Sequence, residues 1–149
     1  MQPSVIEFRP GAVASRRRIL AIDDDDGLLD MLGLLLDQSG LDLRTARGGQ
    51  AGLELATSWD PDLILLDLTM PDLDGVTFIE RYRKAAASPA PIVLLSGALD
   101  GLARAEELGV TMFLAKPFDL GTLVDIVDAY ASHQLHGEGR ADGQGIALG

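Results

Sequence analysis

A run of four apolar residues, Leu63–Leu66, ends directly at Asp67. A strand that is apolar at consecutive positions is typical of the middle of a parallel sheet, where helices cover both faces. Two similar runs lead into charged residues: Ile19–Ile22 precedes four consecutive aspartates, and Met112–Ala115 precedes Lys116. Ligands of open parallel sheets bind beyond the carboxyl ends of the strands. The sequence therefore predicts one crevice lined by carboxylates and an ammonium group, which suits a hard divalent cation and a phosphoryl group.

Composition favours a single cytoplasmic domain. With 149 residues and 47% hydrophobic side chains, the chain can bury one substantial core but is too short for two ordinary domains. No segment approaches the roughly 18 consecutive apolar residues of a membrane span, and the N-terminus lacks the basic-then-apolar order of a signal peptide. We therefore expect no membrane insertion. The absence of cysteine excludes disulfides and Cys-ligated zinc, and a net charge of -11 argues against nucleic acid as a direct ligand.

Strand and helix patterns alternate five times along the chain. The expected strands cover residues 16–22, 41–45, 63–67, 91–96 and 111–115. The expected helices cover residues 26–40, 49–59, 76–86, 102–108 and 119–132, with Asp119 as the N-cap of the last one. We expect residues 1–16 to form a flexible arm, residues 17–134 to form the folded domain, and residues 135–149 to form a disordered, glycine-rich tail.

This alternation predicts a doubly wound α/β fold, in which right-handed crossovers join five parallel strands and helices form a layer on each face. The strand at 41–45 alternates apolar and polar residues, unlike the others, and is therefore expected at an edge. The strand order 2-1-3-4-5 satisfies this condition and has its switch point between strands one and three. The carboxylates that follow Ile22 and Leu66 would then face each other across one crevice.

Short motifs at these strand ends and in the adjoining loops together resemble the receiver domain of two-component response regulators. The motifs are Ile22-Asp23-Asp24, Asp67, Met70-Pro71, Asp74-Gly75, Ser96-Gly97 and Lys116-Pro117-Phe118. The resemblance covers about residues 17 to 133 and implies the flavodoxin-like, CheY-like arrangement of the sheet. It also implies a protein that accepts a phosphoryl group from a histidine kinase or a histidine phosphotransfer protein and signals through a conformational switch.

The resemblance assigns roles to the acidic residues. It implies that Asp67 is the phosphoacceptor. The implied Mg²⁺ site comprises Asp23, Asp24, Asp67 and the backbone carbonyl of Thr69. A carboxylate is a weak nucleophile toward an anionic phosphoryl group, so a divalent cation is needed to offset the repulsion between them.

Other residues match positions that contact or sense the phosphoryl group. Lys116 matches the lysine that contacts this group, and its peptide bond to Pro117 is usually cis in the family. Ser96 matches the switch hydroxyl, and Phe113 matches the switch aromatic but lacks the phenolic hydroxyl of the common tyrosine. Thr69 and Ala98 match positions beside the path of an attacking water. Because neither carries an amide or carboxylate to orient that water, we expect slow self-dephosphorylation.

The implied chemistry is confined to phosphorylation and dephosphorylation of the chain itself, so we do not expect an enzyme that acts on other substrates. A downstream protein partner is expected on the face formed by the fourth helix, the fifth strand and the last helix. Candidate anchors on this face are Leu102, Leu123, Ile126 and Tyr130. For Leu123 and Ile126 an ordinary core position fits the pattern equally well, because a helix on a sheet must bury one stripe.

A second aspartyl-phosphate chemistry is the main alternative. The segment Asp24–Leu29 resembles the Asp-x-Asp-Gly-x-Leu motif of haloacid-dehalogenase-like phosphatases, with Asp24 as nucleophile and Asp26 as general acid. Three departures weigh against it: Leu28 replaces the expected threonine, only the lone Asp100 follows the fourth strand, and no room remains for a cap domain. A binding module that is never phosphorylated is a third class, but the acids and Lys116 give no sign of such a loss.

Overall fold

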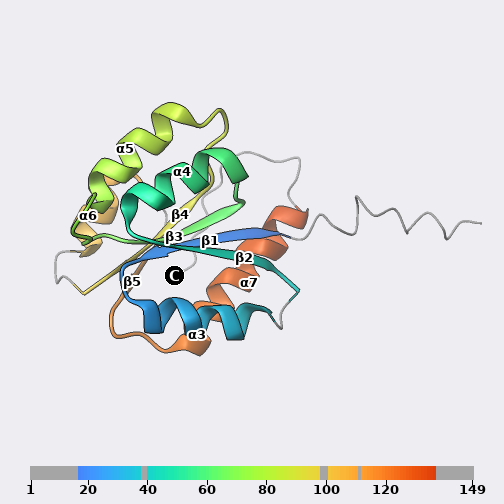
Figure 1. Cartoon of the computed structure of the whole chain (residues 1–149). Coiled ribbons are helices and arrows are strands. Elements are labelled where there is room, and N and C mark those ends of the chain that lie inside the picture. Colours follow the sequence, from blue (N-terminus) through green and yellow to red (C-terminus); the bar gives the residue numbers. More distant parts are fainter. Residues whose placement is uncertain (1–16, 38–39, 98–100, 111, 137–149) are drawn as a thin grey trace, which may run out of the picture.

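The computed structural model describes residues 17–37, 40–97, 101–110 and 112–136 (Figure 1). Its strands are β1 (Arg18–Asp23), β2 (Asp42–Arg47), β3 (Leu63–Asp67), β4 (Ile92–Ser96) and β5 (Met112–Ala115). Its helices are α3 (Asp26–Asp37), α4 (Gly49–Trp59), α5 (Gly75–Ala85), α6 (Gly101–Leu108) and α7 (Leu120–His136). The predicted N-terminal arm and most of the predicted tail lie outside these residues.

The five strands form one parallel sheet in the order β2-β1-β3-β4-β5, as predicted. The strand β2 lies at the edge, which agrees with its alternating sequence. Register pairs Ile22 of β1 with Leu66 of β3, so the residues that follow, Asp23 and Asp67, emerge at the same edge of the sheet. The topology therefore brings together carboxylates that are 44 positions apart in the sequence.

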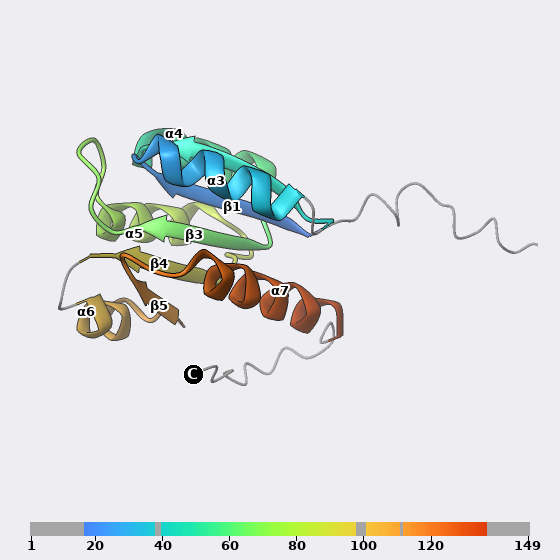
Figure 2. The same cartoon turned by 90° about the horizontal axis from the view of Figure 1, so that it is seen from below.

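Helices cover both faces of the sheet, as Figures 1 and 2 show from two sides. The helices α4, α5 and α6 pack on one face over Ile22, Leu66 and Leu94, while α3 and α7 pack on the other over Ala21, Leu65 and Val93. Every residue of β3 and β4 is buried, which explains why these strands lack alternation. Among the helices of the described residues, none combines the length and apolar character that a membrane span requires.

Several boundaries differ from the predicted ones. The helix α7 continues to His136 instead of ending at Ser132, because no glycine or proline interrupts the chain before Gly137. The helix α5 begins one residue early, at Gly75, where the Asp74 carboxylate accepts a hydrogen bond from the Thr77 backbone N–H at 2.9 Å and caps the helix.

The predicted partner anchors differ in how deeply they are buried. Leu123, on α7, is completely buried against the sheet. The prediction that it anchors a partner at the surface is therefore wrong, and the alternative prediction of a core position is confirmed. Ile126 and Tyr130 are only partly buried. The side chain of Leu102 lies outside the part of the chain that the structure describes.

Candidate functional site

Three aspartates converge at the carboxyl edge of the sheet. Asp23 ends β1 and Asp67 ends β3, and they are only 1% and 5% exposed, whereas the neighbouring Asp24 is open to solvent. One carboxylate oxygen from each of the three lies within 4.8 Å of the others. Oxygen donors gathered on one side of an otherwise open position fit a hard cation such as Mg²⁺, which keeps several waters when bound.

Lys116 reaches this cluster from the loop after β5. Its Nζ lies 2.8 Å from Oδ2 of Asp23 and 3.7 Å from Oδ1 of Asp67. The other oxygen of Asp23, Oδ1, accepts a hydrogen bond from the Asp25 backbone N–H at 3.0 Å. Both oxygens of Asp23 are thus engaged, and this residue holds the ammonium group beside the Asp67 carboxylate.

Burial and charge together set the protonation of the site. The pKa of Asp67 is raised from 3.8 to about 6, first by burial and then by the charge of Asp23, while the ammonium of Lys116 opposes the rise. Burial alone would lower the pKa of Lys116, but its hydrogen bond to Asp23 and the charges of Asp23 and Asp67 outweigh burial and raise it. Burial and the neighbouring Asp23 therefore disfavour the charged form of Asp67, and a cation bound beside the carboxylate would stabilise that form.

The loop after β3 starts at this site. The Thr69 backbone N–H donates to Oδ1 of Asp67 at 3.3 Å, and the Thr69 side chain is exposed. The base of the loop is closed by a hydrogen bond from the Gly75 N–H to the Leu68 carbonyl at 2.9 Å. The backbone of Thr69 therefore lies directly beside the Asp67 carboxylate.

The other predicted site residues lie at the end of β4, on β5 and in the loop after β5, or outside the described residues. Ser96 ends β4 and is buried, and its carbonyl accepts a hydrogen bond from the Lys116 backbone N–H at 2.8 Å. Phe113 lies on β5, paired with Leu94, and is partly buried. The peptide bond between Lys116 and Pro117 is cis, as the family resemblance implies. Ala98 lies outside the described residues.

Sequence reasoning missed the polar contacts of two other residues near the site. Arg47 at the end of β2 forms a two-pronged ion pair with Asp26, at 2.7 Å from Nε to Oδ1 and 3.0 Å from the other guanidinium nitrogen to Oδ2. Asp72 in the β3–α5 loop accepts hydrogen bonds from the backbone of α4. Neither contact follows from a periodic pattern. Two weaker signals point toward them: a run of four aspartates needs partners for its charge, and the residue before α4 is a glycine, which has no side chain to cap the helix.

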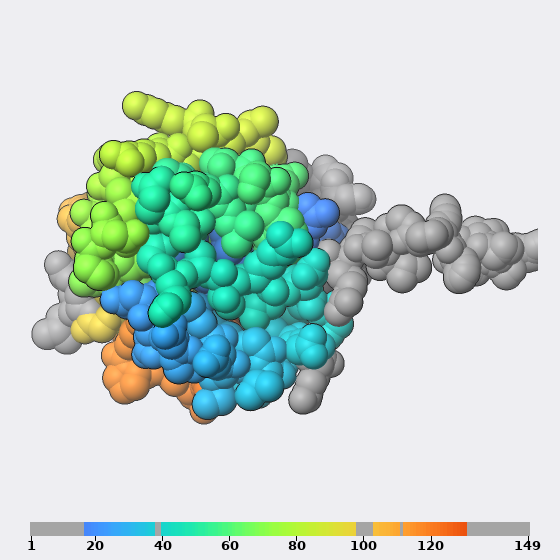
Figure 3. Space-filling view, viewed as in Figure 1, coloured from blue at the N-terminus to red at the C-terminus, as the bar shows by residue number. Residues whose placement is uncertain are grey.

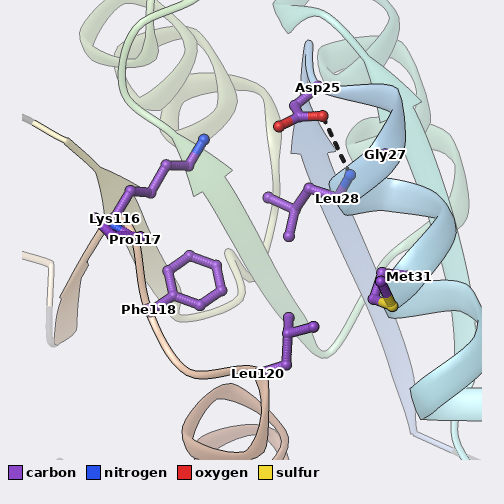
Figure 4. A pocket seen from close by; sticks show the side chains of 8 residues that line it. All are labelled: Asp25, Gly27, Leu28, Met31, Lys116, Pro117, Phe118 and Leu120. Atoms are coloured by element: carbon purple, nitrogen blue, oxygen red, sulfur yellow. Dashed lines mark hydrogen bonds between the residues drawn. The ribbon is translucent and has the colours of Figure 1, made fainter.

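A pocket of about 640 Å³ opens beside Lys116, between the start of α3 and the loop that leads into α7. Its lining is mostly apolar and comprises Asp25, Gly27, Leu28, Met31, Lys116, Pro117, Phe118 and Leu120. Figure 4 shows Leu28 and Met31 on the α3 side facing Phe118 and Leu120 on the other. Met31 is 44% exposed, and Leu34, one turn further along α3, is 69% exposed. The acidic cluster and Lys116 thus adjoin an apolar surface.

Comparison with known proteins agrees with this geometry. The sequence matches the response regulator receiver domain over residues 19–128. The chain belongs to this family. It is 32% identical to sporulation initiation phosphotransferase F of Bacillus subtilis, over 76% of this chain and 92% of that protein. It is 39% identical to the transcriptional regulatory protein PrrA of Mycobacterium tuberculosis over 75% of this chain, and there it spans about half of the relative, 48%.

A solved structure gives the same answer. The response regulator TrrA of Thermotoga maritima, determined in complex with Mg²⁺ and BeF, superposes with a TM-score of 0.67 at 26% identity, covering 76% of this chain and 98% of that one. The receiver function of the chain in a two-component system follows from these matches. The alternative of a haloacid-dehalogenase-like phosphatase is not supported, and Asp26, its general acid, is engaged by Arg47.

Proposed function

We propose that Asp67 of this receiver accepts a phosphoryl group with the help of Mg²⁺ held by Asp24, Asp67 and the backbone carbonyl of Thr69. The observation that carries the proposal is the convergence of the Asp23, Asp24 and Asp67 carboxylates within 4.8 Å, with the Lys116 ammonium 3.7 Å from Asp67. Asp23 belongs to the same acidic cluster and keeps Lys116 in place.

The chemistry needs only these groups. Bound Mg²⁺ offsets the negative charge shared by the acceptor and the phosphoryl oxygens. A carboxylate oxygen of Asp67 forms the new P–O bond while the P–N bond to a donor histidine breaks, and the imidazole keeps that electron pair. Lys116 presents a compact positive charge to a phosphoryl oxygen. The Ser96 hydroxyl donates to another oxygen once the aspartyl phosphate exists.

The donor is a histidine kinase or a histidine phosphotransfer protein, and we place its docking surface on the pocket beside Lys116. A phosphohistidine must come within bonding distance of Asp67, so the donor must bury the surface around the site. The pocket and the exposed side chains of Met31 and Leu34 supply apolar area there. Contiguous exposed apolar surface of this kind is typical of protein interaction sites.

The output surface in this proposal is the face of α6, β5 and α7. The hydrogen bond from the Lys116 N–H to the Ser96 carbonyl ties the end of β4 to the end of β5, on which Phe113 lies. A shift of Ser96 toward a new phosphoryl group can therefore move Phe113, and with it the half-buried side chains of Ile126 and Tyr130 on α7. A protein partner that reads this face would sense the two states.

The nucleophile is tested by phosphorylation with acetyl phosphate and Mg²⁺, followed by intact mass and mapping of the modified residue. Wild type should gain one phosphoryl group on Asp67, and Asp67→Asn should gain none, because the amide keeps the shape of the side chain but cannot attack phosphorus. Label that persists in Asp67→Asn and disappears in Asp24→Asn would refute the proposal and restore the phosphatase assignment.

A further inference from the structure

The helix α4 receives its N-terminal cap from another part of the chain. Its N-cap residue, Gly48, has φ of 116° and provides no side-chain hydrogen bond. The carboxylate of Asp72, in the loop between β3 and α5, takes this place: Oδ1 accepts from the Gly49 N–H at 3.0 Å and Oδ2 from the Gln50 N–H at 3.1 Å. These are two of the N–H groups that a helix leaves without partners at its start.

Close packing reinforces this contact. A Cβ atom built on Gly49 would lie 2.3 Å from the Leu73 carbonyl oxygen, so only glycine lets the start of α4 approach the loop this closely. A Cβ on Gly48 would lie 3.0 Å from Oδ2 of Asp72. In the space-filling view, the surface of α4 meets that of the segment that enters α5 (Figure 3). The two glycines and the carboxylate together form one fitted junction between α4 and the loop.

The same loop carries a ligand of the proposed Mg²⁺ site. It leaves the sheet at Asp67, passes through Thr69 and returns at Gly75, where the Gly75 N–H bonds to the Leu68 carbonyl. Asp74 caps α5, the helix that directly follows the loop, and so does not tie the loop to a distant element. Asp72, three residues beyond Thr69, connects the loop to a helix that precedes it in the chain.

We propose that Asp72 is a positioning residue, which fastens the β3–α5 loop to α4 and thereby holds the Thr69 carbonyl in place for Mg²⁺. This inference rests on the proposed cation site at Asp24, Asp67 and Thr69. Hydrogen bonds from the Gln50 and Gly49 N–H groups lower the pKa of Asp72, so the cap is a carboxylate at neutral pH. Groups that orient metal ligands from outside the coordination sphere commonly control metal affinity.

The coupling must act in both directions. A cation that fixes Thr69 restricts the loop and so stabilises the bonds from Gly49 and Gln50 to Asp72. Mg²⁺ binding should therefore slow hydrogen exchange at these two amides, although they belong to a helix that contributes no ligand.

The test compares Asp72→Ala and Asp72→Asn with Asp74→Ala, which removes a helix cap from the same loop without breaking the link to α4. Mg²⁺ affinity is measured by calorimetry, and exchange of the Gly49 and Gln50 amides by NMR with and without Mg²⁺. We expect Asp72→Ala to bind Mg²⁺ about tenfold more weakly, the lower end of what the loss of an outer-shell partner costs. Asp72→Asn, which keeps one acceptor oxygen, should lie between Asp72→Ala and wild type, and Asp74→Ala should remain near wild type.

A kinetic measurement separates positioning from general damage. In phosphorylation by acetyl phosphate, Asp72→Ala should need about tenfold more Mg²⁺ for the half-maximal rate but should reach the wild-type rate at saturation, because the attacking carboxylate is untouched. Wild-type Mg²⁺ affinity in folded Asp72→Ala, or an equal loss in Asp74→Ala, would overturn the inference while leaving the proposed function intact. Failure of wild type itself to bind Mg²⁺ would overturn both.

Discussion

At the scale of single residues, Asp67 combines a functional charge with an energetic cost. Its pKa is raised from 3.8 to about 6, first by burial and then by the charge of Asp23. The folded protein therefore holds a proton on Asp67 more tightly than the unfolded chain does, so its stability should fall as pH rises from about 4 to about 6 and then level off. Lys116 stays protonated across this range, because its pKa is raised from 10.5.

Between pH 4 and pH 6, we expect the unfolding free energy of metal-free wild type to fall by up to about 3 kcal/mol relative to that of Asp67→Asn. This figure converts the rise in the pKa of Asp67 at about 1.36 kcal/mol per pKa unit. Unfolding by denaturant in EDTA, followed by fluorescence of the single tryptophan, Trp59, measures the difference at each pH. Stability curves of wild type and Asp67→Asn that run parallel from pH 4 to pH 7 would contradict the buried-anion description.

The run of four aspartates shows how identical residues acquire different roles from position alone. Asp23 ends a buried strand and binds Lys116, and Asp24, although exposed, brings a carboxylate oxygen within 4.8 Å of one of Asp67. Asp25 accepts from the Leu28 N–H at 3.2 Å and caps α3, while Asp26 pairs with Arg47. The family resemblance predicted Asp23 and Asp24 as members of one acidic metal site, but not the ion pair of Asp23 with Lys116. The sequence could not predict the roles of Asp25 and Asp26, because they depend on where the strand stops and on which side the neighbouring strand β2 lies.

At the scale of elements, the short helix α6 is fastened to α5 at its C-terminal end. The guanidinium of Arg83 donates to the carbonyl of Leu108 and, at 3.3 Å, to that of Gly109. These are carbonyls that the end of a helix leaves unpaired, and a positive charge there also complements the helix dipole. Because α6 has only eight residues and belongs to the proposed output face, this clamp should control how easily the helix opens.

Replacing Arg83 by alanine should therefore speed amide exchange in α6 roughly fivefold, the equivalent of about 1 kcal/mol for hydrogen bonds of this kind. The matched control is Lys84→Ala, which removes the adjacent positive charge from the same turn of α5. Unchanged exchange in Arg83→Ala would contradict the clamp, and equally faster exchange in Lys84→Ala would show that positive charge in this turn, and not the hydrogen bonds of Arg83, controls the opening of α6.

The elements themselves were largely predictable. Continuous apolar runs identified β1, β3 and β4, because a strand buried on both faces is apolar at almost every position before its carboxyl end, and alternation identified β2 as the edge. Helix ends were less predictable, since α7 runs past Ser132 through residues that carry no strong stop signal. The cap of α4 by Asp72 was out of reach, because the two partners are 23 residues apart and belong to different periodic patterns.

At the scale of the whole molecule, the acidic cluster and the apolar pocket lie at the same end of the fold, and Lys116 belongs to both. A small phosphodonor and a protein phosphodonor should use this end of the fold differently. Acetyl phosphate needs only the cluster around Asp67. In the proposed docking mode, a phosphohistidine protein in addition buries the surface of α3 that carries Met31 and Leu34, both exposed. Changes on this surface should therefore affect protein donors alone.

We expect Leu34→Asp, alone or with Met31→Asp, to lower kcat/KM for transfer from a phosphohistidine protein selected on wild type by about tenfold or more, because one central interface side chain commonly contributes over about 1.4 kcal/mol. Phosphorylation by acetyl phosphate at saturating Mg²⁺ should stay at the wild-type rate, since neither residue touches the cluster. The control is Glu80→Ala, on the exposed side of α5 across the sheet. If protein-donor transfer were unaffected in Leu34→Asp, or if both donors slowed together, the exposed surface of α3 that carries Met31 and Leu34 would not be the docking surface.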